Sequence, residues 1–168
     1  LGALCSSPIL SAQERWTAIG PSDIQRSWQQ HGIINTAVEE GVLSLSSTMD
    51  QGGGWLLSPD VYTDFHLKLT YRLTGNGRGK IAFRVPGSQD APADITGYGV
   101  HLSTDPVQQN SAGSIIDVAR ATWLEEIDYS TWQQLDITAV GDHLRVYQNG
   151  IKITETHNRR SAAGQLAL

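Results

Sequence analysis

Two polar side chains, His101 and Arg84, interrupt apolar strand-like runs and have the chemistry of a reactive site. Each is flanked on both sides by apolar residues, in residues 98–102 and 83–85. Side chains alternate between the two faces of a strand, so both should point away from the core. An imidazole can transfer protons near neutrality, and a guanidinium offers a rigid fork of donors to an oxyanion or hydroxyl. The alternatives are an ordinary exposed strand histidine and an arginine in a cross-strand ion pair.

Several familiar chemistries lack the residues that they need. The sequence has no Gly-x-Ser-x-Gly, phosphate-binding or dinucleotide-binding motif. Its histidines, single cysteine and carboxylates do not have the spacing of a structural zinc site. We therefore expect no cofactor, although loop carboxylates and carbonyls could assemble a calcium or other divalent-ion site. A net charge of −5 without a run of Lys or Arg argues against nucleic acid as a partner.

Short alternating runs predict that strands position these side chains. From Phe65 to Leu73 apolar and polar residues alternate, which is typical of a strand with one buried face. A glycine-rich turn, residues 74–79, precedes a second alternating run that ends at Val85. We expect these two strands to form an antiparallel hairpin.

A further hairpin is predicted around Asn149-Gly150, because both turn positions favour residues that accept positive φ. This turn places Gln148 opposite Ile151, and Val146 opposite Ile153. With 17 glycines and many such short runs in 168 residues, the chain should form one all-β sandwich or barrel.

The first twelve residues are uncharged and end in the small residues Ser11 and Ala12, as the later part of an export signal does. We interpret residues 1–12 as a remnant of such a signal and residues 13–168 as the single domain. The protein should then be exported, to the periplasm or the extracellular space, with no transmembrane segment in the mature domain. A lipid anchor through Cys5 and an ordinary apolar N-terminal strand are the alternatives.

Seven short fragments, taken in order, carry a family resemblance. The chain resembles the 3-keto-disaccharide hydrolase domain family, of the concanavalin A-like lectin/glucanase fold group, over residues 38–168. The fragments are Glu40-Gly41-Val42-Leu43, Gly53-Gly54-Trp55-Leu56, Asp64-Phe65-His66-Leu67, Phe83-Arg84-Val85-Pro86, Gly97-Tyr98, Asp117-Val118-Ala119 and Asn149-Gly150-Ile151-Lys152.

The resemblance implies an antiparallel two-sheet β-sandwich of jelly-roll type, with a saccharide groove on a concave outer face. The family usually has one more strand after the region that ends here at Leu168, so we expect the last strand to be missing and a sheet edge to be unpaired. The expected core consists of Phe65, Leu67, Leu69, Tyr71, Phe83, Val100, Leu135, Ile137, Leu144, Val146 and Ile153.

The resemblance also implies a glycoside-cleaving hydrolase acting on 3-keto-glycosides or related saccharides, by elimination and hydration or by general acid/base catalysis. A ketone at C3 acidifies the C2 proton, so cleavage needs a base near C2, a group that stabilises the enolate and an acid for the leaving oxygen. On this reading His101 is the base and Arg84 holds the enolate or a sugar hydroxyl. Asp117, which falls in the family's Asp-x-Ala-like stretch, is the acid or a hydroxyl acceptor and lies at the rim of the site.

Three further residues are expected to bind the substrate. Trp123 could stack on a sugar face, and Arg120 could hold a hydroxyl group. Asp105 could be the second acid or hold a hydroxyl group, but the turn before Pro106 is its favoured role.

One departure from the family weakens the catalytic reading. Where the family tends to have Gly-Tyr-Glu-Val-Gln, this chain has Gly99 in place of the glutamate and His101 in place of the glutamine. A carboxylate expected on the outward face is therefore absent. The alternative hypothesis is a non-catalytic carbohydrate-binding or adhesion module on the same fold.

Overall fold

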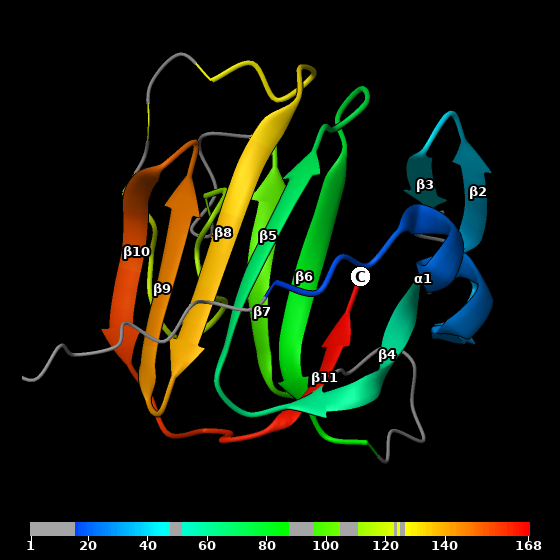
Figure 1. Cartoon of the computed structure of the whole chain (residues 1–168). Helices are drawn as coiled ribbons and strands as arrows, with labels where there is room; N and C mark the ends of the chain where they lie inside the picture. Colours follow the sequence, from blue (N-terminus) through cyan, green and yellow to red (C-terminus); the bar gives the residue numbers. More distant parts are fainter. Residues whose placement is uncertain (1–15, 48–51, 88–95, 105–110, 123, 125–126) are drawn as a thin grey trace, which may run out of the picture.

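The computed structural model describes residues 16–47, 52–87, 96–104, 111–122, 124 and 127–168, and it is almost entirely β. Two antiparallel sheets pack face to face, which confirms the predicted sandwich (Figure 1). The five-stranded sheet has the order β1 (Gln29–Gly32), β4 (Gly54–Tyr62), β11 (Gly164–Ala167), β6 (Arg78–Val85) and β7 (Tyr98–Ser103). The four-stranded sheet has the order β10 (Ile151–His157), β9 (His143–Gln148), β8 (Gln133–Val140) and β5 (Phe65–Tyr71).

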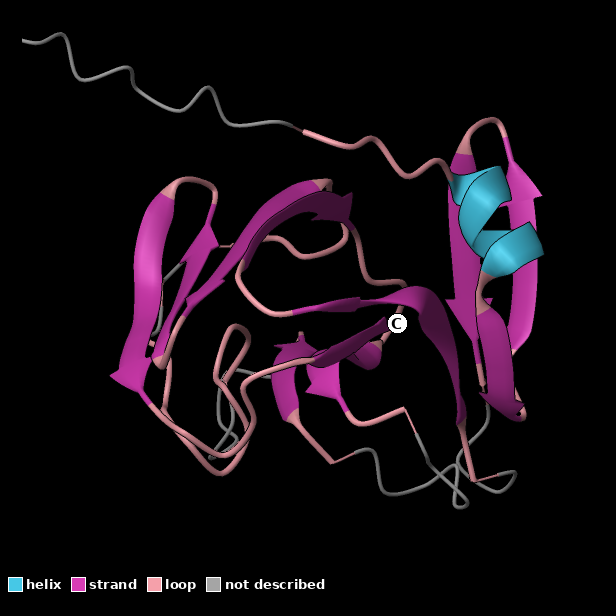
Figure 2. Cartoon of the chain, turned by 60° about the horizontal axis from the view of Figure 1, so that its bottom comes forward, coloured by secondary structure: helices cyan, strands magenta, loops and turns pink. Residues whose placement is uncertain are grey.

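A short helix and a small hairpin flank the sandwich on one side. The helix α1 (Pro21–Ser27) packs beside β2 (Asn35–Glu39) and β3 (Val42–Ser46), away from the four-stranded sheet (Figure 2). Proline at the first turn suits the start of α1, because its missing N–H is one that the helix leaves unpaired. This helix is far too short to cross a membrane, and no other described segment forms a membrane-spanning helix.

The predicted core residues lie between the two sheets. Phe83, Leu135 and Val146 are completely buried, and Phe65 meets Phe83 edge-on with ring centroids 5.6 Å apart. Every residue of the predicted core belongs to this cluster or packs against it. Burial of each large apolar side chain stabilises the fold by about 1.5–3 kcal/mol, so this cluster is the main source of stability.

The prediction that residues 65–73 and 81–85 form one hairpin is wrong. β5 pairs with β8 in the four-stranded sheet, whereas β6 pairs with β7 and β11 in the five-stranded sheet. The intervening glycine-rich segment therefore carries the chain from one sheet to the other. Alternation alone cannot distinguish these cases, because both strands turn an apolar face toward the same core.

The hairpin around Asn149-Gly150 is confirmed, but its register shifts after two pairs. Gln148 lies opposite Ile151 as predicted, and then a bulge at Ile153 places Thr154 opposite Val146. The bulge changes which residues face inward, so Ile153 is buried while Ile151 is half exposed.

The C-terminal strand β11 is central rather than peripheral. It pairs with β4 on one side and β6 on the other, and Leu168 exchanges two backbone hydrogen bonds with Leu56, of 2.9 and 3.0 Å. The predicted export remnant at residues 1–12 lies outside the described residues. The export itself and a further strand beyond Leu168 stay predictions.

Candidate functional site

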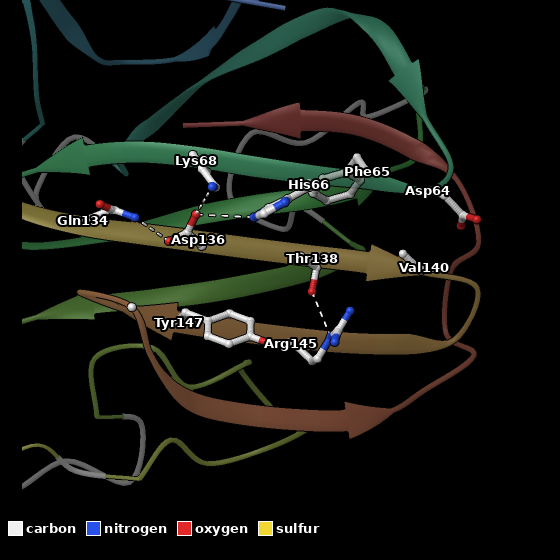
Figure 3. A pocket seen from close by; sticks show the side chains of 11 residues that line it. Asp64, Phe65, His66, Lys68, Gln134, Asp136, Thr138, Val140, Arg145 and Tyr147 are labelled. Carbon is white, nitrogen blue, oxygen red and sulfur yellow. Dashed lines mark hydrogen bonds and ion pairs between the residues drawn. The ribbon is translucent and has the colours of Figure 1, made fainter. Parts of the chain in front are cut away.

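The outer face of the four-stranded sheet carries a groove of about 650 Å³, here called the β5–β8–β9 groove (Figure 3). The residues that line the groove form rows across the paired strands. Lys68, Asp136 and Tyr147 form one row across β5, β8 and β9, and His66, Thr138 and Arg145 form the next. Directly paired residues on antiparallel strands share a face, so all six side chains point away from the core.

Asp136 is a buried carboxylate within the groove. Its side chain is 8% exposed, and its Oδ2 accepts a 2.8 Å hydrogen bond from Gln134 Nε2. Its Oδ1 lies 3.4 Å from His66 Nε2 and 3.9 Å from Lys68 Nζ, yet it accepts no hydrogen bond from the described residues. A buried acceptor left without a donor is costly, because its hydration is lost without replacement.

The side chains that cover Asp136 are themselves partly exposed. His66 and Lys68 are 31% and 48% exposed, so rotation of either would open the carboxylate to a ligand. A hydroxyl group of a ligand is a suitable donor for Asp136 Oδ1, because bonds to ionised acceptors are stronger than neutral ones.

The rest of the groove supplies donors and a ring. Arg145 Nε donates a 3.2 Å hydrogen bond to Thr138 Oγ1, which orients its guanidinium along the face. Tyr147 is half-buried beside Arg145 and offers both an aromatic ring and a hydroxyl group (Figure 3). A few polar groups around an aromatic surface suit a neutral ligand rich in hydroxyl groups.

Ion pairs border the groove on β9 and β10. His143 and Lys152 both contact Glu155, and these contacts lower the pKa of Glu155, the contact with Lys152 having the larger effect. His157 and Arg159 likewise lower the pKa of Asp142. The His143 and His157 rings stack with their centroids 4.5 Å apart. Within the described ranges, no group of three or more His, Cys, Asp or Glu could hold a metal ion.

Arg84 does not point outward, so this part of the site prediction is wrong. It is 1% exposed, and its guanidinium donates to the carbonyl oxygens of Thr63 at 2.8 and 3.0 Å, Gly141 at 2.7 Å and Ser161 at 3.2 Å. The cause is a bulge in β6: Val85 pairs with Gln165 but Ala82 with Ala167, and Arg84 has φ 51°. The extra residue breaks the alternation on which the prediction depended.

His101 lies on the outer face of the five-stranded sheet, across from Lys80 in register. It is 9% exposed, and its backbone is bonded to residues 113 and 114, which border β7. The outward orientation is as predicted. However, His101 and Arg84 do not bracket a common space, and the β5–β8–β9 groove is on the opposite side of the sandwich.

Asp117 and Arg120 are both exposed, in the segment that follows the border of β7. Asp117 has φ 58° within a turn closed by bonds from Val118 and Ala119 to the Ile115 carbonyl. This left-handed conformation suits aspartate and gives Asp117 a structural reason to be there. Asp105 and Trp123 lie outside the described residues.

The residues that do converge have no local signal in the sequence. Alternation places His66 and Lys68 on the face opposite to Phe65 and Leu67, but Asp136 comes from a strand some seventy residues further along the chain. Their proximity depends on the pairing of β5 with β8, which the expected β5–β6 hairpin concealed.

The two packed antiparallel sheets define the chain as a β-sandwich. The chain belongs to the 3-keto-alpha-glucoside-1,2-lyase-like domain family, whose sequence model matches residues 11–168. No curated protein matches the sequence.

Solved structures share the fold at low identity. Carbohydrate-binding module CBM66 from Bacillus subtilis is similar with a TM-score of 0.62 and 21% identity, over 84% of this chain and 85% of that one. A putative glycosyl hydrolase from Parabacteroides distasonis has a TM-score of 0.61 and 14% identity, over 79% of this chain and 75% of that one. A protein of unknown function with a galectin-like fold from Bacillus subtilis has a TM-score of 0.59 and 13% identity, over 87% of this chain and 83% of that one.

Proposed function

We propose that this chain binds saccharides in the β5–β8–β9 groove. The observation that carries the proposal is Asp136 Oδ1, a buried carboxylate oxygen that lacks a hydrogen-bond donor among the described residues. A sugar hydroxyl would satisfy it, while Arg145 and Gln134 would bond to neighbouring hydroxyl groups. The similarity to a carbohydrate-binding module and the family match support a saccharide ligand.

The test is a calorimetric titration with methyl α-D-glucopyranoside and with its 3-keto derivative. We expect Asp136→Ala to weaken binding about tenfold or more, because hydrogen bonds to a charged group contribute about 1.5–3 kcal/mol. Asp60→Ala is the matched control, since Asp60 is an exposed aspartate on β4 of the other sheet. Equal affinity of both variants and the unaltered chain would refute the assignment of this groove.

A second candidate function is cleavage of the 3-keto-glycoside by elimination. His66 beside Asp136, with Lys68 and Arg145 on the same face, favours it. His66 would remove the C2 proton, a cationic side chain would stabilise the enolate at O3, and the C1–O bond would break as the leaving oxygen takes a proton. Addition of water to the resulting double bond would complete the hydrolysis.

Incubation with methyl 3-keto-α-D-glucopyranoside, with and without a chelator, separates cleavage from binding alone. Release of methanol that is lost in His66→Ala supports the enzyme. Binding without methanol release supports a non-catalytic module. Methanol release that survives in His66→Ala but disappears in His101→Ala would mean that the catalytic site lies on the five-stranded sheet.

A further inference from the structure

The segment before α1 reaches the margin of the β5–β8–β9 groove. In Figure 1 it runs from α1 across the sandwich toward β5. There the ring centroid of Trp16 lies 4.8 Å from that of His66, and Lys68 Nζ lies 4.7 Å from the Trp16 centroid. Both partners are outward-facing residues of β5 that line the groove.

These contacts connect Trp16 to the centre of the groove. His66 and Lys68 are the two side chains that approach Asp136 Oδ1. Trp16 therefore contacts both side chains that cover the unsatisfied carboxylate, and a ligand that displaces His66 or Lys68 would come close to the indole.

The indole is held in place but remains half exposed. Trp16 is 51% exposed, in contrast to Trp28, which is 9% exposed and part of the core. An edge contact and a cation–π contact restrain the ring, while the exposed surface remains available. A restrained aromatic surface beside hydrogen-bonding groups complements a pyranose, which presents C–H bonds on its faces and hydroxyl groups around its edge.

We propose that Trp16 is a ligand-contacting residue that lies at the β5 margin of the groove and stacks on the apolar face of a bound pyranose. The inference rests on the proposed saccharide binding at this groove. It adds that a segment outside the sandwich completes the site, with the ring stacked on Trp16 and one hydroxyl directed to Asp136. Anchoring the N-terminal segment to β5 is the purely structural alternative.

Trp132 provides a matched control. It is 50% exposed and makes its own cation–π contact, with Arg72 at 5.1 Å. Arg72 is not one of the described residues that line the groove, whereas His66 and Lys68, the partners of Trp16, are. Substitution of either tryptophan removes one exposed indole and one cation–π contact. Only Trp16→Ala removes an aromatic surface that contacts groove-lining side chains.

The test measures the affinity of the full chain and its variants for methyl α-D-glucopyranoside and its 3-keto derivative by calorimetry. We expect Trp16→Ala to weaken binding about three- to tenfold, Trp16→Phe to recover most of the loss, and Trp132→Ala to bind like the unaltered chain. Ligand should also quench the indole fluorescence of the unaltered chain and of Trp132→Ala more than that of Trp16→Ala.

The outcomes separate the two proposals. If the unaltered chain binds and Trp16→Ala binds equally well, the stacking role is wrong and the groove assignment stands. Equal weakening by the two alanine substitutions would also overturn the stacking role. If the unaltered chain binds neither glucoside, both proposals fail.

Discussion

Arg84 uses its guanidinium to connect three turns at one end of the sandwich. Its carbonyl partners belong to the β4–β5 turn, the β8–β9 turn and the loop before β11, and Asp64 lies 3.5 Å away. A buried cation with this many acceptors is a structural element, because its removal leaves carbonyl groups without donors.

We predict that Arg84→Ala lowers the free energy of unfolding by about 2–4 kcal/mol. Arg120→Ala, at an exposed position, should change it by less than about 0.5 kcal/mol. Urea denaturation of the two variants measures the difference. A stable Arg84→Ala variant that has lost saccharide binding would instead support a role in the site.

Tyr71 is a buried tyrosine with a polar partner in the core. Its hydroxyl donates a 3.1 Å hydrogen bond to Gln148 Oε1 inside the core. Burial, followed by the neighbouring Tyr129, raises the pKa of Tyr71 above its ordinary value of 10.0. The folded state therefore keeps its proton at a pH where the unfolded chain releases it.

The free energy of unfolding should fall as pH rises above about 10, because Tyr71 then loses its proton in the unfolded chain but not in the folded one. Tyr71→Phe should cost about 1–2 kcal/mol at neutral pH, since Gln148 loses its donor, and should reduce the alkaline decline. Burial also raises the pKa of Tyr129, so part of the alkaline decline in stability should remain in Tyr71→Phe. Urea midpoints at about pH 8 and pH 11 measure both effects, and an unchanged alkaline slope would contradict the assignment to Tyr71.

At the scale of elements, β11 fits between its neighbours only because Gly164 lacks a side chain. A Cβ there would lie 2.3 Å from the Arg84 carbonyl carbon, at the bulge of β6. Gly164→Ala should therefore displace β11 and destabilise the chain by about 1–3 kcal/mol or more.

Gly79→Ala is the control within a strand, because among the described residues a Cβ at Gly79 meets only Leu102 Cδ1, at 4.0 Å. Thermal unfolding of the two variants should show a large loss of Tm for Gly164→Ala and a small change for Gly79→Ala. Similar Tm values would mean that β11 tolerates displacement.

The elements that sequence reasoning predicted well are those with a local signal. Asn149-Gly150 specifies its hairpin because the turn and the adjacent alternation are contiguous. Pairing between β5 and β8 has no such signal, since the partners are distant and either sheet would bury the apolar face of β5. The bulges at Arg84 and Ile153 were equally hidden, because one extra residue changes the facing of a strand without changing its composition.

For the same reason the sequence indicated the candidate residues of one strand at a time, but not the site. His66 and Lys68 were recognisable as outward-facing, and so was His101. Which outward residues meet is decided by strand order, and strand order placed Asp136 and Arg145 beside β5 and left His101 on the other sheet.

For the whole molecule, two carboxylates at the β9–β10 border that are paired with cationic side chains should make the stability of the fold depend on pH in the acid range. The pKa values of Asp142 and Glu155 are lowered in the folded state, so their contribution is present above the ordinary values of 3.8 and 4.5 and is lost as pH falls through the lowered values. The double variant Asp142→Asn, Glu155→Gln should show a smaller decline in urea midpoint between about pH 5 and pH 2.5. An equally steep decline would place the acid sensitivity elsewhere.

The sandwich presents two outer faces, and the proposed function depends on which one meets saccharide. The four-stranded face carries Asp136 and its neighbours, and the five-stranded face carries His101 and Lys80. A binding surface changes the environment of backbone amides in the strands that form it.

Amide NMR shifts of the isotope-labelled chain during titration with methyl α-D-glucopyranoside and its 3-keto derivative therefore test the central claim most directly. If saccharide binds in the β5–β8–β9 groove, the largest amide shift changes should occur at His66, Lys68, Asp136 and Tyr147, and β6 and β7 should be unaffected. Shifts concentrated at Lys80 and His101 instead would contradict the account.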